Sequence, residues 1–227
     1  MIQQDNIIDI DGNIYKTVKI GNQIWMAENL KVTHYRNGDQ ILNINNNSQW
    51  VENYALPEHY KSGAYCNYNN DINNVELYGR LYNDYAVIDK RGLAPKGWNI
   101  PTNEEIVELE MHLGMSQEEA DRFGLESPRG TNEGSKLAGN ADLWSNGNLK
   151  NNTEFGTSGF DFLPGGLRNF DDGNYHGMGD HGQFWARPNT WRVPYHAYGR
   201  GLRYDYSKIE FSDYKTDYGF SVRCIKD

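Results

Sequence analysis

Residues 101–114 read Pro-Thr-Asn-Glu-Glu-Ile-Val-Glu-Leu-Glu-Met-His-Leu-Gly, which is the clearest helical pattern in the chain. Thr102 and Glu105 have the spacing of a capping box, in which each side chain bonds the backbone N–H of the other residue. Apolar residues follow at helical spacing: Ile106, Leu109 and Leu113. The stretch therefore predicts a helix that begins at Thr102 and ends at Gly114.

A second, shorter helix is predicted directly after the first. Ser116 stands three residues before Glu119, which repeats the capping-box spacing, and Gly124 is a suitable end. We expect these two helices and no others in the chain.

The segment before the helices has the pattern of a small β-meander. Asp11-Gly12 and Gly21-Asn22 suit tight turns, and between them Ile14, Val18 and Ile20 share one face of the predicted strands. From Asn37 to Tyr65 the sequence is polar and without a sustained period, which predicts a long structured loop.

After Gly130 the sequence is rich in Gly, Asn and aromatic residues, with short β-like pieces between turns. The last piece, Tyr218–Ile225, alternates, so Phe220, Val222 and Cys224 are expected on its inner face. Strands, then helices, then strands again indicate an α+β fold. Since no fixed repeat and no Pro-rich or Ser-rich linker divides the chain, we expect one domain over residues 1–227.

Composition excludes several classes of protein. The 22 basic and 31 acidic residues give a formal charge of -9, which repels phosphate backbones and argues against a nucleic-acid partner. An aromatic content of 13% argues against disorder. No apolar run approaches the roughly 20 residues of a transmembrane helix. Residues 1–6 lack a signal-peptide pattern, so we expect either a cytoplasmic protein or one whose leader is absent from this chain.

Five blocks of sequence carry a resemblance to a known family. They are Asp9–Leu30, Tyr78–Ala86, Gly92–Thr102, Phe162–Asn169 and Tyr218–Cys224. In this order they resemble the Fibrobacter succinogenes major paralogous domain family, over about Asp9 to Asp227. The resemblance implies a C-type lectin-like fold with short antiparallel sheets, related to the formylglycine-generating enzyme. It also implies an extracellular or outer-surface protein of Bacteroidetes-type bacteria, often a lipoprotein, and it implies no known ligand.

The chain departs from the family pattern at two places. Trp185-Ala186-Arg187-Pro188 stands where members often have Trp-Ser-Ser-Thr, and Leu93-Ala94-Pro95 stands where many have Cys. The first departure lies in the expected ligand-facing region, and the second removes one possible partner for a cysteine.

Cys66 and Cys224 are the two cysteines of the chain. The resemblance to the formylglycine-generating enzyme raises the alternative of a copper-dependent oxidase, which needs a close pair of reactive thiols. Only Cys224 lies in the matching region, and no basic residue or helix start adjoins Cys66 to lower its pKa. We therefore expect structural thiols, either buried or joined in a disulfide.

Two polar segments invite a metal-site interpretation. His176 and His181 lie five residues apart in a glycine-rich segment without a third ligand at a diagnostic spacing, so we expect a solvated hairpin-like loop and no metal there. Residues 69–74, Asn-Asn-Asp-Ile-Asn-Asn, have oxygen ligands suited to calcium but no EF-hand pattern, and Asx-turns explain them equally well. Calcium stays an alternative, and no other cofactor is expected.

No enzyme signature is present in the sequence. Gly-x-Ser-x-Gly is absent, Gly134-Ser135-Lys136 lacks the preceding glycine of a P-loop, and the spacing of carboxylates does not report their separation in space. We expect a protein that is not an enzyme.

An aromatic and arginine-rich segment near the C-terminal strands is the predicted binding surface. Tyr, Trp and Arg are enriched where proteins recognise ligands, although alternate aromatic residues of a strand also pack inward. The predicted ligand-binding residues are Trp185, Arg187, Trp191, Tyr195, His196, Tyr198, Arg200 and Tyr204, with Arg192 and Tyr206 nearby. The hypothesis is a non-catalytic surface module that binds a glycan or a surface protein; a purely structural domain is the remaining alternative.

Overall fold

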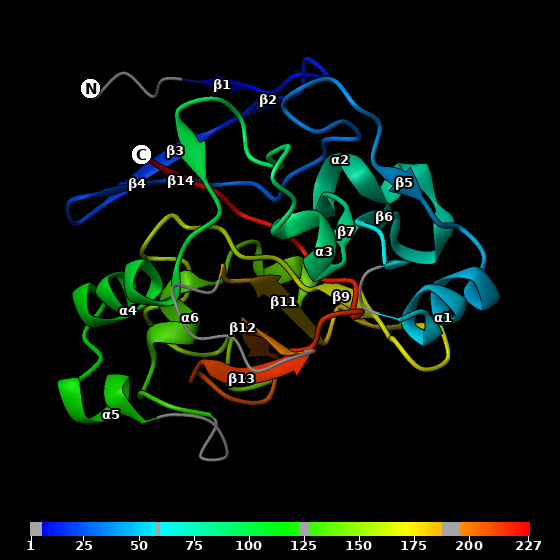
Figure 1. Ribbon diagram of the computed structural model, residues 1–227. Helices are drawn as coiled ribbons and strands as arrows, with labels where there is room; N and C mark the ends of the chain where they lie inside the picture. Colours follow the sequence, from blue (N-terminus) through cyan, green and yellow to red (C-terminus); the bar gives the residue numbers. More distant parts are fainter. Residues whose placement is uncertain (1–5, 58–59, 123–127, 188–195) are drawn as a thin grey trace.

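The computed structural model describes residues 6–57, 60–122, 128–187 and 196–227, with only the backbone of His196 (Figure 1). This part of the chain has a mixed α+β fold, which confirms the predicted class. The helices are α1 (Asn47–Ala55), α2 (Val75–Tyr78), α3 (Asp84–Val87), α4 (Asn103–His112), α5 (Gln117–Asp121) and α6 (Glu133–Leu137). The chain thus forms more helices than the two expected. No described helix has the length and apolar character that a membrane span requires.

The strands are short and form four small sheets. They are β1 (Ile7–Ile8), β2 (Ile14–Tyr15), β3 (Thr17–Ile20), β4 (Gln23–Met26), β5 (Leu42–Asn43), β6 (Ala64–Cys66), β7 (Leu81–Tyr82), β8 (Trp98–Asn99), β9 (Gly165–Arg168), β10 (Tyr175–Met178), β11 (His181–Trp185), β12 (His196–Arg203), β13 (Glu210–Lys215) and β14 (Ile225–Lys226). The sheet orders are β1-β2, β3-β4-β14-β8, β5-β6-β7 and β10-β9-β11-β12-β13. Most pairs are antiparallel, and β5–β6 and β9–β11 are parallel.

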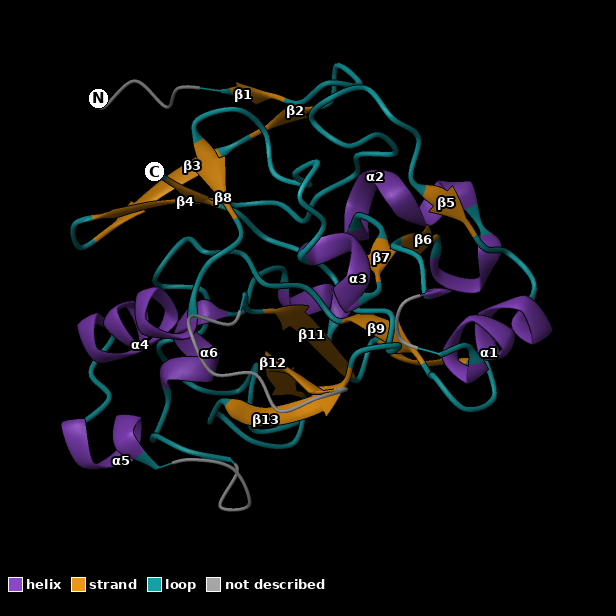
Figure 2. Ribbon diagram, viewed as in Figure 1, coloured by secondary structure: helices purple, strands orange, loops and turns teal. Residues whose placement is uncertain are grey.

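The five-stranded sheet lies at the centre of the fold (Figure 2). In this view α4, α5 and α6 lie to one side of it and α1 lies to the other, while the β3-β4-β14-β8 sheet lies above with both chain ends. Two large clusters of buried apolar residues fill the space between these layers.

Helix α4 forms where the sequence predicts it. The backbone N–H of Thr102 donates to Oε2 of Glu105 across 2.7 Å, and the N–H of Glu105 donates to Oγ1 of Thr102 across 3.3 Å, which confirms the capping box. Ser116 caps α5 by accepting from the N–H of Glu119 at 3.2 Å. Gly124, the expected end of the second helix, lies outside the described residues.

Helix α1 lies in the segment that was expected to be a loop. Asn46 caps it by accepting from the N–H of Gln49 at 3.2 Å, and Trp50 is its one buried residue. A single buried side chain leaves no repeating apolar stripe, so the periodicity of the sequence does not signal the helix.

The predicted turn at Gly21-Asn22 is confirmed, because Ile20 pairs with Gln23 across it. The prediction that Ile14 and Ile20 share one face is wrong: Ile14 is 56% exposed and Ile20 is 5% exposed. The chain leaves the β-ladder between β2 and β3, so the alternation restarts there.

The C-terminal segment is buried on both of its faces. Phe220, Val222 and Cys224 lie in one core cluster, as predicted. Arg223 is buried as well: its Nη2 donates to Oδ1 of Asn29 at 2.9 Å, and its Nη1 donates to the carbonyl of Phe160. The regular alternation of residues in this segment therefore does not indicate that one of its faces is exposed to solvent.

Candidate functional site

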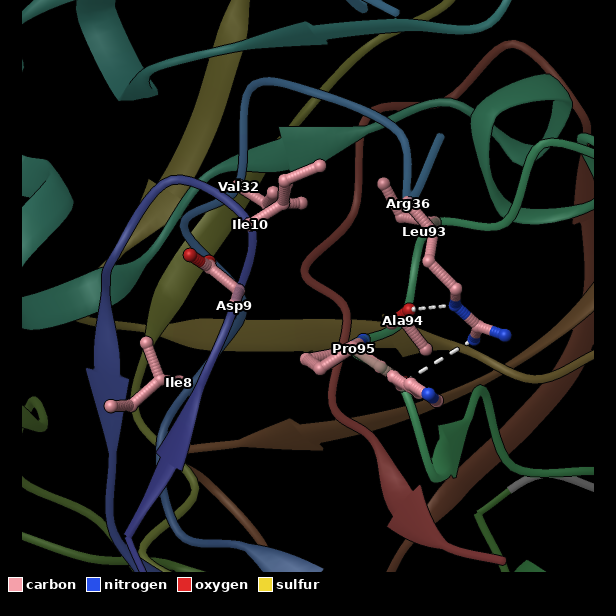
Figure 3. A pocket seen from close by; sticks show the side chains of 9 residues that line it. Ile8, Asp9, Ile10, Val32, Arg36, Leu93, Ala94 and Pro95 are labelled. Atoms are coloured by element: carbon pink, nitrogen blue, oxygen red, sulfur yellow. Dashed lines mark hydrogen bonds between the residues drawn. The ribbon is translucent and has the colours of Figure 1, made fainter. Parts of the chain in front are cut away.

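Arg36 fixes the loop that separates two adjoining pockets. Its Nε donates to the carbonyl of Ala94 at 2.9 Å, and its Nη2 donates to the carbonyl of Pro95 at 3.3 Å (Figure 3). The same Nη2 also donates to the carbonyl of Trp98 at 3.1 Å. These three bonds hold the loop after Val32 against residues 93–98. Both pockets are lined by Arg36, Leu93 and Ala94.

The first pocket, of about 280 Å³, lies between the turn at Ile8–Ile10 and the segment Leu93–Lys96 (Figure 3). Its one carboxylate, that of Asp9, is already used. It accepts from the N–H groups of residues 11 and 13 and from the Tyr15 hydroxyl, the last at 2.6 Å. Asp9 therefore stabilises the turn, and the pocket offers an apolar wall with two cations, Lys96 and Arg36, of which Arg36 is already bonded to backbone carbonyls.

The second pocket, of about 330 Å³, is here named the Arg187 pocket. Its residues are Arg36, Val87, Ile88, Asp89, Lys90, Gly92, Leu93, Ala94, Trp98, Asn99, Ile100, Arg187 and Asp227. The apolar members are mostly buried, whereas Lys90 and Arg187 are exposed. The pocket thus combines an apolar floor with a charged rim.

The charges at the rim are not all committed to neighbours. The Asp89 carboxylate binds Arg91, with Oδ2 2.8 Å from Nη2. These contacts outweigh burial and lower the pKa of Asp89. No ion pair within the described ranges engages Lys90 or Arg187. Within the described structure, these two cations are therefore available to a ligand.

Asn99 adds a neutral acceptor to the same pocket. Its Nδ2 donates to Oδ1 of Asp227 at 3.1 Å, while its Oδ1 is buried with no hydrogen-bond partner in the described structure. A buried polar atom without a partner is uncommon and costs free energy until a donor reaches it.

Arg187 reaches the pocket because β11 continues past its last sheet residue. The N–H of Arg187 donates to the carbonyl of Pro101 at 2.7 Å, and Arg187 forms a parallel bridge with Thr102. The residue before it, Ala186, is buried. The backbone is thus held against the start of α4 while the Arg187 side chain is exposed.

Two predicted ligand contacts are core residues, so the prediction is wrong for them. Trp185 has no exposed surface, its ring lies 4.4 Å from that of Phe220, and its Nε1 donates to the carbonyl of Tyr82 at 2.7 Å. Arg200 is buried against Glu110, with Nε 2.6 Å from Oε1. Neither side chain reaches the surface.

Of the other predicted residues, the described side chains of Tyr198, Tyr204 and Tyr206 do not line the Arg187 pocket. Tyr198 is half-buried, and its ring lies 5.9 Å from that of Phe211. Tyr204 packs against the core cluster that contains Ile209. Tyr206 donates to Glu210. Trp191, Arg192 and Tyr195 lie outside the described residues, as does the side chain of His196.

Sequence reasoning missed most of the Arg187 pocket. Lys90 lies just before the block Gly92–Thr102 and Asn99 lies within it, and this block signalled the family without indicating a ligand. The bridge between residues 102 and 187, together with the hydrogen bond from Arg187 to Pro101, brings this block beside the predicted binding segment. The one useful signal was that Leu93-Ala94-Pro95 and Arg187 both depart from the family pattern.

A family model described as the Fibrobacter succinogenes major domain matches residues 18–226. The chain belongs to this family. The predicted family is thereby confirmed, whereas the lectin-like relation stays a prediction. No curated protein and no solved structure matches the chain significantly. In this family member the matched residues include all of the Arg187 pocket except Asp227. The turn at Ile8–Ile10 lies before the first matched residue.

The two cysteines of this family member are free and buried. They lie in different clusters, Cys224 with Phe220 and Cys66 with Tyr68. Burial raises the pKa of both thiols. The alternative of a disulfide is not realised, and the expected structural thiols are found as buried side chains.

The two predicted polar segments have ordinary local structure. His176 lies on β10, in a hairpin with β9, and its Nε2 is 3.8 Å from Oδ2 of Asp172. In the other segment, Oδ1 of Asp71 accepts from the N–H of Asn73 at 2.9 Å, which is an Asx-turn. No group of three or more His, Cys, Asp or Glu suited to a metal occurs among the residues that the structure describes.

Proposed function

We propose that this family member is a non-catalytic binding module that recognises an acidic glycan in the Arg187 pocket. The observation that carries the proposal is the combination in one pocket of Lys90 and Arg187, two cations without an ion-pair partner among the described residues, with the buried Oδ1 of Asn99, which has no described hydrogen-bond partner. A pocket of about 330 Å³ is within the usual range for small-molecule sites.

The side chains match the chemistry of a sugar carboxylate. A guanidinium binds a carboxylate through two parallel hydrogen bonds, and an ammonium adds a point charge. A sugar hydroxyl could donate to Oδ1 of Asn99, which would satisfy that buried atom. The apolar floor at Leu93 and Trp98 suits the C–H face of a sugar ring.

The net charge of -9 makes this local arrangement more informative. An acidic protein repels anions at long range, so binding an acidic sugar requires close, uncommitted cations. Because these cations are exposed, salt would screen their attraction. The proposal therefore includes weaker binding at high ionic strength.

The buried cysteines support a non-catalytic role. An oxidase of the formylglycine-generating type needs reactive thiols, and burial raises the pKa of both Cys66 and Cys224 away from the reactive thiolate form. We further propose, from the family resemblance, that the domain works at the outer surface of a bacterium, where glycans are accessible.

A glycan array tests the proposal. The wild-type protein should bind uronic-acid or sialic-acid glycans in preference to their neutral counterparts, and Arg187→Met should abolish that preference. Arg203→Met is the matched control, since Arg203 is exposed and does not line the pocket. Binding to neutral glycans alone, or equal binding by Arg187→Met, would overturn the proposal.

A further inference from the structure

His34 and Asp11 form a hydrogen-bonded pair on a different part of the surface. Nδ1 of His34 lies 2.6 Å from Oδ1 of Asp11, and Oδ2 of Asp11 accepts from the hydroxyl of Thr33 at 2.8 Å. Although burial raises the pKa of Asp11, the bonds from Thr33 and His34 outweigh it and lower the pKa. The carboxylate is therefore ionised at neutral pH.

This pairing fixes the tautomer of the imidazole. A carboxylate only accepts hydrogen bonds, so Nδ1 of His34 carries the hydrogen. In the neutral ring, Nε2 then keeps its lone pair and is an acceptor. No described residue forms a hydrogen bond with Nε2 of His34.

His34 lines a pocket of about 390 Å³, here named the His34 pocket. Its residues are Thr33, His34, Gln40, Ile41, Leu42, Asn43 and Tyr65. It shares none of them with the Arg187 pocket. None is Lys, Arg, Asp or Glu, which favours a ligand without charge.

The backbone holds several polar side chains in place around this pocket. His34 and Gln40 form an antiparallel bridge, and Asn43 pairs with Tyr65 in the parallel ladder of β5 and β6. Across the described structure, no hydrogen bond engages the side chains of Gln40 and Asn43 or the hydroxyl of Tyr65. Burial raises the pKa of Tyr65, the charge of Arg80 opposes this only in part, and the charge of Asp11 adds to it, so the phenol stays a donor.

Leu42 supplies an apolar contact beside these polar groups. It is 51% exposed although it belongs to β5, whereas its neighbour Ile41 is buried. An exposed leucine beside a ring acceptor and two amides suits a ligand with a methyl group next to an N–H and several hydroxyls.

We propose that the His34 pocket is a second binding site, which takes a neutral sugar bearing an acetamido group. The acetamido N–H donates to Nε2 of His34, and the acetyl methyl packs on Leu42. Sugar hydroxyls bond the side chains of Gln40 and Asn43. This site does not depend on the Arg187 pocket, because the two have different residues and different ligand chemistry.

The test is a titration of the ¹⁵N-labelled protein with N-acetylglucosamine, with glucose as the probe that lacks the acetamido group. N-acetylglucosamine should produce saturable shifts of the amides of residues 33–43 and 64–66, and glucose should bind about tenfold more weakly because the N–H contact and the methyl contact are lost. Absence of saturable shifts in these segments, or equal binding of the two sugars, would overturn the proposal.

Two variants with matched controls complete the test. His34→Gln and Leu42→Ala should each weaken N-acetylglucosamine binding by several-fold, while His176→Gln and Leu77→Ala should not. Leu77 is 46% exposed and His176 is exposed, and neither lines the pocket. If His34→Gln disturbs the turn at Asp11, Leu42→Ala alone decides, since its side chain lies at the surface. Wild-type affinity in Leu42→Ala would overturn the proposal, and Arg187→Met should leave this binding unchanged.

Discussion

Nε of Arg200 on β12 donates to Oε1 of Glu110 on α4 across 2.6 Å, in the interior of the protein. Nη2 of Arg200 also donates to Oδ1 of Asn103 at 2.8 Å, at the start of the same helix. Asn103 follows Thr102, whose bridge with Arg187 places that residue at the pocket. Arg200 is therefore buried and helps to hold α4, whose start lies beside the Arg187 pocket.

Glu110→Gln should destabilise the protein by about 3–5 kcal/mol, because it leaves two buried guanidiniums without their counter-charge. The second is Arg129, which also bonds the Glu110 carboxylate. Glu108→Gln, on the exposed side of α4, should change stability by less than about 0.5 kcal/mol. Urea unfolding followed by circular dichroism measures both. Similar midpoints for the two variants would show that the buried pair does not stabilise the fold.

Trp185→Ala should cost about 3–5 kcal/mol of folding stability, as expected for a large aromatic side chain removed from a core. It also leaves the Tyr82 carbonyl without its donor. Arg187→Met, two residues along, should leave the thermal midpoint nearly unchanged because that side chain is exposed. Differential scanning calorimetry would contradict this assignment if Trp185→Ala melted like the wild type.

His181 should make the protein less stable as the pH falls. Burial lowers the pKa of its imidazole below the usual 6.5, and the nearby Glu210 carboxylate opposes this only in part. Below about pH 6.5 the unfolded chain therefore binds a proton more readily than the folded one, so stability is lost as pH decreases.

Urea midpoints of the wild type and His181→Phe between pH 7.5 and 5.5 measure this effect. His181→Phe should show a flatter dependence on pH than the wild type. Equal slopes for the two proteins would mean that His181 does not titrate differently on folding.

Cys66 and Cys224 should react with a thiol reagent only after unfolding, because both are buried and burial raises the pKa of both. Ellman's reagent should detect no thiol in the native protein and two in urea. A thiol that reacts rapidly in the native protein would revive the alternative of an oxidase.

Local signals in the sequence predicted local structure well. The capping residue Thr102 and the turn at Gly21-Asn22 depend on a few neighbouring residues, and both predictions are confirmed. The order of strand and helix patterns was enough for the α+β class. Helix α1 was missed because one buried residue, Trp50, gives no period.

Long-range contacts limited the prediction of the site. Trp185 and Arg200 have the composition of a binding surface, and only their pairing with residues 82 and 110 shows that they are buried. The Arg187 pocket joins residues about 90 positions apart through one bridge at Thr102, which no local pattern reports. Arg187 was predicted because it belongs to the aromatic and arginine-rich segment, and it also lies where the chain departs from the family pattern.

The most direct test of the central proposal compares glucuronic acid with glucose, which differ only in a carboxylate at the position of a hydroxymethyl group. Titration of the ¹⁵N-labelled protein should show saturable shifts for residues 90–100 and 187 with glucuronic acid alone. These shifts should weaken with added salt and disappear in Arg187→Met. Shifts confined to other residues, or an equal response to both sugars in the wild type, would contradict an acidic-glycan site at Arg187.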